Sequence, residues 1–301
     1  MSKNNAYWKK INSQQTKCIR RFHNFFKQTL FDQYVDADNT KVLELAAGRG
    51  FDLFKHKLAG VKYTLFANKN VDAIQIAKNK YTEQLKNQDF PVDFLEVDLT
   101  SNQTLAIEEV MKKSGIDKFD IVSIQFAFHY FLENKKTLDE FFKNIDTHLK
   151  PGGYVLITTL DGQKVFGLLS EKKQGETLEF HNPKGDTLFA IKKLYINADE
   201  SKNANNAKNV KNAENLKKKS FKDLGQKIEV FVHSIGQFHP EYLVNYDYIK
   251  KYFTKHNYQV VDEGSFSKFL KNFGQKKKCR LSETELQYSN LHKYLVLQKN
   301  K

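Results

Sequence analysis

The segment "VLELAAGRGFDLFK", Val42 to Lys55, determines how the rest of the chain is interpreted. Apolar residues open it, Gly48 and Gly50 lie in its middle, and apolar residues return at helical spacing after Asp52. This order is typical of a strand, a tight turn and a helix, because glycines let the backbone turn sharply and let a ligand approach the main chain. We interpret the segment as the first strand–turn–helix unit of an α/β domain.

Strand-like and helix-like segments alternate through the middle of the chain, from residue 39 to about residue 166. Apolar runs predict strands, and amphipathic stretches between them predict helices. Such alternation is typical of a doubly wound, mostly parallel sheet, as in Rossmann-like α/β domains. We predict strands at residues 41–46, 62–67, 92–97, 119–128 and 152–160, and helices at 51–59, 70–85, 103–113 and 137–149.

The predicted turns and flanking segments complete the domain organisation. "KPGG", residues 150–153, predicts a turn between the last of these helices and the fifth strand. Residues 1–36 predict a basic helical extension, and residues 37–301 the α/β domain. Late in this domain we predict a hairpin, a helix and an antiparallel C-terminal strand. Residues 197–219 are rich in Asn and Lys with few large apolar residues, which predicts a flexible insertion.

Composition narrows the function classes. The 301 residues include 49 Lys and Arg against 35 Asp and Glu, and the net charge of +14 favours polyanionic partners, chiefly nucleic acid. No run of about 20 apolar residues predicts a membrane span, and the N-terminus lacks a signal-peptide pattern. Cys18 and Cys279 lack metal-ligand spacing, so we predict no metal site but two free thiols in a reducing, intracellular compartment.

The glycine turn and the following strand ends indicate a nucleoside-containing ligand. The turn lacks the phosphate-binding Lys-Ser/Thr and the third glycine of dinucleotide sites, which leaves S-adenosylmethionine as the favoured cofactor. Asp52 would meet its amine, Asn68 its ribose hydroxyls and Asp98 its adenine amino group. Two alternatives stay open: Asp52 as an ordinary acid at a helix N-terminus, and Asp98 as a plain turn residue.

The fourth strand leads into "SIQFAFHYF", Ser123 to Phe131, where polar groups lie among aromatic residues. In a doubly wound sheet, Gln125, His129 and Tyr130 would leave the carboxyl end of this strand beside the cofactor. Aromatic rings next to hydrogen-bonding groups suit a flat heterocycle such as a purine base.

At these residues the chain resembles the mRNA cap guanine-N7 methyltransferases, and most closely those of large cytoplasmic DNA viruses and similar cytoplasmic elements. "QFAFHY" followed by "KPGGY" is the specific part of the resemblance, which covers about Ile19 to the C-terminus. The matching segments are "RRFHNFFK" at 20–27, "LELAAGRGFDL" at 43–53, "QFAFHY" at 125–130, "HLKPGGYVLITTLDGQKV" at 148–165, Glu241 to Val244, and "KYLVLQK" at 293–299.

The resemblance implies a class I methyltransferase fold and methyl transfer from S-adenosylmethionine to N7 of the guanine of 5'-capped RNA. It implies partners as well, namely other capping-enzyme subunits or an activating subunit, and a nuclear location for a cellular enzyme or a cytoplasmic one for a viral enzyme. The implied cofactor residues are Lys27, Ala46, Gly48, Asp52, Asn68, Asp98, Gln125, Phe126 and Tyr130, and the implied guanine residues are Asn24, His129, Tyr130, Glu241 and Tyr294.

The chain departs from the family pattern at several of these positions. Asn68 replaces the ribose-binding acid, Ala46 and Ala47 replace Gly-Cys, and Phe51 replaces a glycine. These departures leave two alternatives open: a methyltransferase for another substrate, and a catalytically weak RNA-binding or regulatory subunit of a capping complex.

Overall fold

The computed structural model describes residues 14–37, 39–85, 89–196, 221–276 and 279–301. The predicted insertion at residues 197–219 lies outside these residues. The chain forms two compact units. The large-sheet unit comprises Asn24–Thr159, Lys250–Ser265 and Lys293–Lys301, and the small-sheet unit comprises Met1–His23, Leu160–Ile249 and Phe266–His292. The predicted boundary at residue 36 falls inside the large-sheet unit and stays a prediction.

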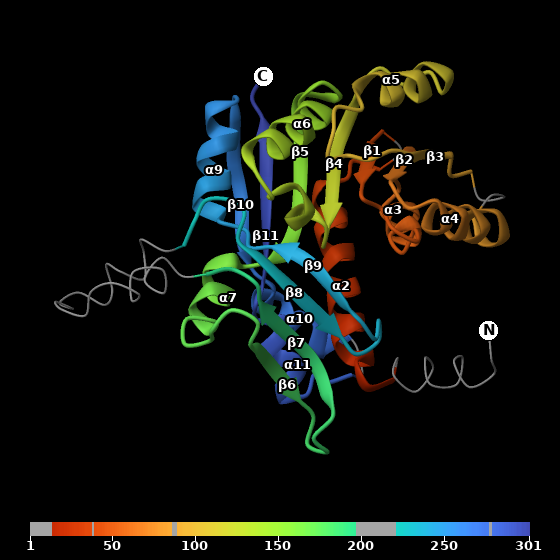
Figure 1. Ribbon diagram of the computed structural model, residues 1–301. Helices are drawn as coiled ribbons and strands as arrows, with labels where there is room; N and C mark the ends of the chain where they lie inside the picture. The colour runs from red at the N-terminus through yellow and green to blue at the C-terminus, as the bar shows by residue number, and fades with distance from the viewer. Residues whose placement is uncertain (1–13, 38, 86–88, 197–220, 277–278) are drawn as a thin grey trace. The chain divides into compact units, whose positions relative to one another are not determined.

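A seven-stranded sheet forms the core of the large-sheet unit, in the order β10-β11-β5-β4-β1-β2-β3 (Figure 1). The pairs β1–β2, β1–β4, β2–β3 and β4–β5 are parallel, whereas β10 and β11 are antiparallel. The predicted fold class, including the antiparallel C-terminal strand, is therefore confirmed. The strands are β1 (Lys41–Leu45), β2 (Tyr63–Asn68), β3 (Val92–Glu96), β4 (Phe119–Gln125), β5 (Leu149–Leu160), β10 (Tyr258–Ser265) and β11 (His292–Lys299).

The helices of this sheet begin where the sequence supplies capping groups. Asn70 accepts a hydrogen bond from the backbone of Ala73 at 2.7 Å, and Asn134 accepts one from Thr137 at 3.0 Å. Such side-chain acceptors satisfy backbone N–H groups that lack a helical partner. The helices are α3 (Leu53–Leu58), α4 (Val71–Gln84), α5 (Thr104–Lys113), α6 (Lys135–Asp146) and α9 (Tyr246–Lys255), with α9 reaching into both units.

Two local predictions differ from the structure in where β5 begins and where β4 ends. The predicted turn at residues 150–153 is an irregularity inside β5 rather than the connection before it. Phe119 pairs with Leu149 and Ile121 with Tyr154, so residues 150–153 have no partner in β4, and Gly152 has φ 77°. The fourth strand ends at Gln125 rather than at Phe128, since the chain turns into the 3-10 helix η1 (Phe128–Phe131). Apolar patterning alone does not distinguish these local geometries.

The small-sheet unit contains an antiparallel sheet in the order β6-β7-β8-β9. The predicted hairpin is confirmed by the pairing of β6 and β7. Strand β9 and helix α11 are additions that the sequence pattern did not predict. The elements are β6 (Thr177–His181), β7 (Thr187–Lys193), β8 (Lys227–Val232), β9 (Phe238–Tyr242), α7 (Gly162–Leu168), η2 (Phe266–Phe269), α10 (Leu270–Lys276) and α11 (Glu283–Ser289).

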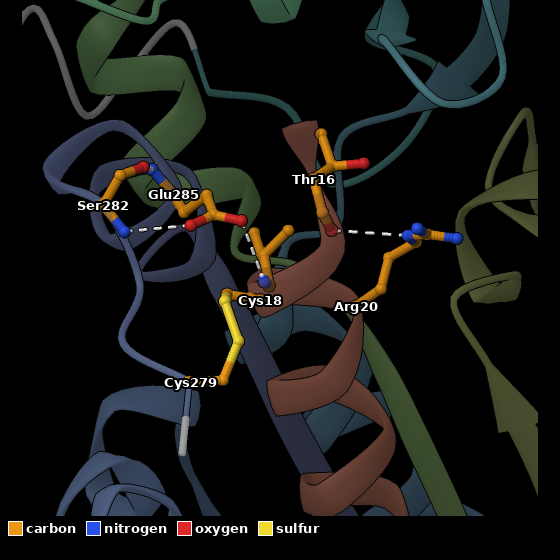
Figure 2. The surroundings of a disulfide bond; sticks show 7 residues. Thr16, Cys18, Arg20, Cys279, Ser282 and Glu285 are labelled. Atoms are coloured by element: carbon orange, nitrogen blue, oxygen red, sulfur yellow. Dashed lines mark hydrogen bonds between the residues drawn. A yellow bond between two sulfur atoms is a disulfide. The ribbon is translucent and has the colours of Figure 1, made fainter. Parts of the chain in front are cut away.

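Helix α2 (Lys17–Tyr34) is the predicted basic helix, and it begins in the small-sheet unit and ends in the large-sheet unit. Its first turn carries Cys18, which forms a disulfide bond with Cys279 at a Cα–Cα distance of 5.7 Å (Figure 2). The prediction of two free thiols is therefore wrong. The two cysteines are 261 positions apart, and such a spacing does not show that the fold brings them together. None of the helices in the described residues is long and apolar enough to span a membrane.

Candidate functional site

The predicted cofactor residues follow neighbouring strands of the large sheet. Strands β4, β1, β2 and β3 are adjacent and parallel, so their carboxyl ends lie along one edge. Asn68 and Gln125 are the last residues of β2 and β4, Gly48 follows β1, and Asp98 follows β3. Ligands of open α/β sheets bind at this edge. The structure thus brings these four positions to the carboxyl edge of the parallel strands, where they were expected.

The glycine turn after β1 leaves its main chain accessible at one point. Ala46, Gly48 and Gly50 all have positive φ, of 55°, 54° and 65°. A Cβ atom added at Gly48 would meet nothing within 4 Å, whereas one at Gly50 would lie 2.8 Å from the Cβ of Ala77. Gly48 therefore faces open space, and Gly50 is required by packing against α4.

A buried ionic cluster holds α2 to the start of α3. The Asp52 carboxylate lies 2.6 Å from the Nζ of Lys27 and 2.9 Å from the Nζ of Lys55, and all three side chains are buried. Burial alone would raise the pKa of Asp52, but the two lysine charges outweigh it and hold that pKa well below its usual range. Asp52 is therefore ionised, and its carboxylate fixes the Lys27 ammonium group.

The end of β4 is fixed by Thr158 of β5. Thr158 donates a hydrogen bond to Oε1 of Gln125 at 3.0 Å and accepts one from the backbone N–H of Phe126 at 3.0 Å. Phe126 has φ 56°, which is uncommon for a residue with a side chain and typical of constrained ligand sites. The Nζ of Lys27 lies 5.5 Å from the centre of the Phe126 ring. Lys27, Asp52 and Phe126 therefore form one group.

His129 and Tyr130 of η1 differ in exposure. His129 is buried, with Nδ1 3.2 Å from the hydroxyl of Thr159, whereas 42% of the Tyr130 surface is exposed. Their ring centres are 4.2 Å apart. Tyr130 therefore presents an aromatic surface beside a fixed imidazole. Asn24 is exposed on α2, three residues before Lys27 and hence on the same helix face.

The other predicted cofactor acid has a structural partner. Oδ1 of Asp98 accepts hydrogen bonds from the backbone N–H and the hydroxyl of Thr100, at 3.0 and 2.7 Å. Burial opposes ionisation of Asp98, but the two Thr100 bonds and the charge of Lys69 together outweigh it and lower the pKa of Asp98. Both of its predicted roles, turn residue and adenine acceptor, are compatible with this arrangement. Asn68 is half-buried, and its backbone carbonyl accepts a hydrogen bond from the backbone N–H of Val97 at 3.0 Å.

The two remaining guanine residues lie in different units. Tyr294 belongs to the large-sheet unit, is buried, and donates its hydroxyl to Asp262 at 3.1 Å. Glu241 lies in β9 of the small-sheet unit, where it is paired with Ile228. Burial raises the pKa of Glu241 to about 8, and the charge of Glu241 adds to burial in raising the pKa of Tyr288. The guanine roles of Tyr294 and Glu241 stay predictions.

A buried acid–imidazole pair next to the glycine turn was not predicted. Oε2 of Glu44 in β1 lies 3.3 Å from Nε2 of His56 in α3, and Nδ1 of His56 lies 3.1 Å from the hydroxyl of Thr64. Burial raises the pKa of Glu44 even though His56 opposes this. The acid inside the apolar run "VLEL" was the available clue, because a charge in a buried strand requires a partner.

Comparison with known proteins identifies the family of the chain. The model of the mRNA (guanine-N(7))-methyltransferase domain matches residues 2–293. A probable mRNA-capping enzyme of Acanthamoeba polyphaga mimivirus is 28% identical over 65% of this chain and 18% of its own length. An mRNA cap guanine-N(7) methyltransferase of Caenorhabditis elegans is 34% identical over 54% of this chain and 43% of its own length.

The match therefore spans less than half the length of both relatives. A solved S-adenosylmethionine-dependent methyltransferase from Clostridium acetobutylicum shares the fold, with a TM-score of 0.54 and 14% identity over 97% of this chain and 98% of that one. Because the family model matches nearly the whole sequence, the chain belongs to the mRNA (guanine-N(7))-methyltransferase domain family.

Proposed function

We propose that the chain transfers a methyl group from S-adenosylmethionine to N7 of the terminal guanine of 5'-capped RNA. The observation that carries the proposal is the group formed by Lys27, Asp52 and Phe126 at the carboxyl edge of the sheet, in a chain of this family. Positioned cations and aromatic residues at that edge suit a ligand with both ionic and flat aromatic parts.

The residues at the sheet edge fit the cofactor. Gly48 leaves room for close approach to the main chain. The cluster of Lys27, Lys55 and Asp52 has one positive charge in excess, which favours the carboxylate of an amino acid. We therefore assign Lys27 to that carboxylate, and Asp52 both to orienting Lys27 and to the amine. Asn68, Asp98, Gln125, Phe126, Ala46 and Tyr130 complete the proposed cofactor site.

The guanine would be held by stacking and by its polar edge. Tyr130 offers the exposed ring, and His129 is fixed by Thr159. We add Asn24 to this set because of its match to the family sequence pattern. We retain Tyr294 and Glu241 in the proposal, with Glu241 as acceptor for the N1 and amino groups of guanine. Losing one such base contact costs about 1–3 kcal/mol of discrimination.

The chemistry requires positioning rather than a general base. Bound S-adenosylmethionine supplies a methyl group on a positively charged sulfur, and guanine N7 already carries a lone pair. The protein must therefore align the two reactants and exclude water. Such alignment accounts for roughly 7–11 kcal/mol of barrier lowering in well-oriented reactions.

Partners and location follow from the same proposal. We propose capped RNA as the substrate, with other capping-enzyme subunits or an activating subunit as further partners, in the nucleus for a cellular enzyme and in the cytoplasm for a viral one. The net charge of +14 supports a polyanionic substrate.

The test is a transfer assay with labelled S-adenosylmethionine and RNA that carries either a GpppG end or an uncapped triphosphate end. We expect label on the capped RNA alone, and loss of transfer in Lys27→Met, Tyr130→Ala and Glu241→Ala. Calorimetry of cofactor binding separates the alternatives. No cofactor binding would favour a regulatory RNA-binding subunit, and transfer to other acceptors alone would favour a different methyltransferase.

A further inference from the structure

The disulfide of the small-sheet unit connects the first turn of α2 to the segment that precedes α11 (Figure 2). We propose that Cys18 and Cys279 form a reversible thiol–disulfide exchange site, whose closed form locks the start of α2. The site and its chemistry do not depend on methyl transfer.

Contacts without sulfur hold the same two segments together. Oε1 of Glu285 accepts a hydrogen bond from the backbone N–H of Ile19 at 3.0 Å, and Oε2 accepts one from the backbone N–H of Ser282 at 2.9 Å. Glu285 is buried, and Figure 2 shows its carboxylate between α2 and Ser282. One carboxylate therefore serves N–H groups at the starts of both α2 and α11.

Aromatic and polar contacts extend this arrangement along α2. The rings of Phe22 and Phe273 are 5.2 Å apart, and Nε2 of His23 lies 3.0 Å from the hydroxyl of Ser289. The His23 ring also contacts that of His292, at 4.9 Å. Since none of these contacts uses the cysteines, we expect them to keep the two thiols close after reduction. Reclosure is then intramolecular, at a high effective concentration.

The two cysteines are partly exposed and have basic neighbours in the sequence, and both features favour exchange. Cys18 and Cys279 are both partly exposed, and exposed Lys17 and Arg280 are their sequence neighbours. Positive charges stabilise a thiolate, which is the form that attacks disulfides. The sequence contains two cysteines in total, so the pair has no competing partner within the chain.

The closing reaction consumes a small disulfide such as oxidised glutathione. One cysteine thiolate attacks a sulfur of that disulfide and expels one glutathione thiolate. The attacking cysteine and the remaining glutathione are then joined in a mixed disulfide. The second cysteine thiolate then attacks the cysteine sulfur of the mixed disulfide and expels the second glutathione thiolate. Two electrons pass from the cysteines to glutathione, and reduced glutathione reverses both steps.

The two ends of α2 should respond differently to reduction. Residues 17–23 are held by the disulfide and the Glu285 contact, whereas Lys27 is held by Asp52 in the large-sheet unit. Breaking the disulfide removes one anchor of the first turns and leaves the ionic anchor intact. We therefore expect reduction to loosen the start of α2 alone.

The experiment uses the full chain in buffers with graded ratios of reduced to oxidised glutathione. Free thiols are trapped by alkylation and counted by mass spectrometry, and a peptide map identifies the linked pair. We expect a reversible titration between a linked Cys18–Cys279 form and a form with two thiols. Cys18→Ser and Cys279→Ser should show no linked form and should instead hold one glutathione in oxidising buffer.

Hydrogen exchange on the same samples tests the effect on α2. On reduction, amides of residues 17–23 should exchange at least about tenfold faster, while those of residues 28–34 change little. A disulfide that persists in excess reduced glutathione, or thiols that never pair in excess oxidised glutathione, would overturn the exchange site. Equal hydrogen-exchange rates of residues 17–23 in the oxidised and reduced protein would overturn the proposal that the disulfide locks the start of α2. Because the redox titration uses the wild-type protein, its result does not depend on whether the cysteine variants fold.

Discussion

The two ends of helix α2 are anchored by different chemistry. Toward its C-terminal half, Lys27 reaches a buried carboxylate, Asp52, that it shares with Lys55. At its start, Cys18 is bonded covalently to Cys279, and Glu285 accepts the Ile19 N–H. The ionic anchor belongs to the proposed cofactor site and responds to the loss of a charge. The covalent anchor lies in the other unit and responds to the redox state. The Lys27 end of the helix therefore contributes to the proposed cofactor site, whereas the Cys18 end is linked to the segment before α11.

Breaking the ionic anchor should have the largest effect. Asp52→Asn leaves two buried lysine ammonium groups without their carboxylate, so we expect a loss of about 3–5 kcal/mol in the free energy of unfolding. Urea denaturation measures this loss. The matched control is Lys113→Ala, which removes an exposed ion pair with Glu109 and should cost less than about 1 kcal/mol. Equal losses in the two variants would contradict the buried anchor.

Breaking the covalent anchor should come second. The double variant Cys18→Ser, Cys279→Ser should lose about 2–4 kcal/mol of unfolding free energy relative to the oxidised protein, because the cross-link restricts the unfolded chain. In reducing buffer the wild type and the variant should denature at nearly the same urea concentration. A difference that persists after complete reduction would mean that the serines, rather than the lost cross-link, cause the change.

The two glycines of the turn after β1 should differ in what they contribute to stability and to the proposed cofactor site. Gly50→Ala places a methyl group 2.8 Å from Ala77 at a positive φ, and overpacking of this kind costs about 1–3 kcal/mol of stability. In Gly48→Ala the added methyl group meets nothing within 4 Å, so the loss of stability is limited to the backbone strain of a positive φ, about 1–2 kcal/mol. We expect Gly48→Ala to impair cofactor binding more than stability. Calorimetry and thermal melts measured on both variants decide this.

Glu241 should give the smallest effect, and it depends on pH. Because its folded pKa is about 8 against an ordinary value of 4.5, folding favours the protonated carboxyl. The associated stability is present below the unfolded pKa of 4.5 and is lost as the pH rises through 8. The Glu241 side chain is half-buried rather than fully buried, so solvent screening limits the change in unfolding free energy to about 1–2 kcal/mol. Glu241→Gln should remove this pH dependence, and parallel pH profiles of the two proteins would contradict it.

The features that could be predicted from the sequence are those that depend on the local pattern of residues. The strand–helix alternation predicted the parallel sheet, and the positions of Gly48, Asn68, Asp98 and Gln125 at its carboxyl edge followed from topology. The pattern could not predict that Lys27 would neutralise Asp52, since the two residues meet only through the packing of α2. The Glu44–His56 pair and the disulfide were missed for the same reason: each joins side chains whose separation depends on the tertiary fold.

Identification of the methylated atom tests the proposed methyl transfer to guanine N7. Wild-type protein, S-adenosylmethionine and GpppG-capped RNA are incubated together, and the RNA is digested to release its cap for chromatography and mass spectrometry. We expect the methyl group to be recovered as 7-methylguanosine in the cap, and Lys27→Met to abolish its formation. A methyl group found on a ribose, on an internal base or on no RNA atom, from protein that binds the cofactor, would contradict it.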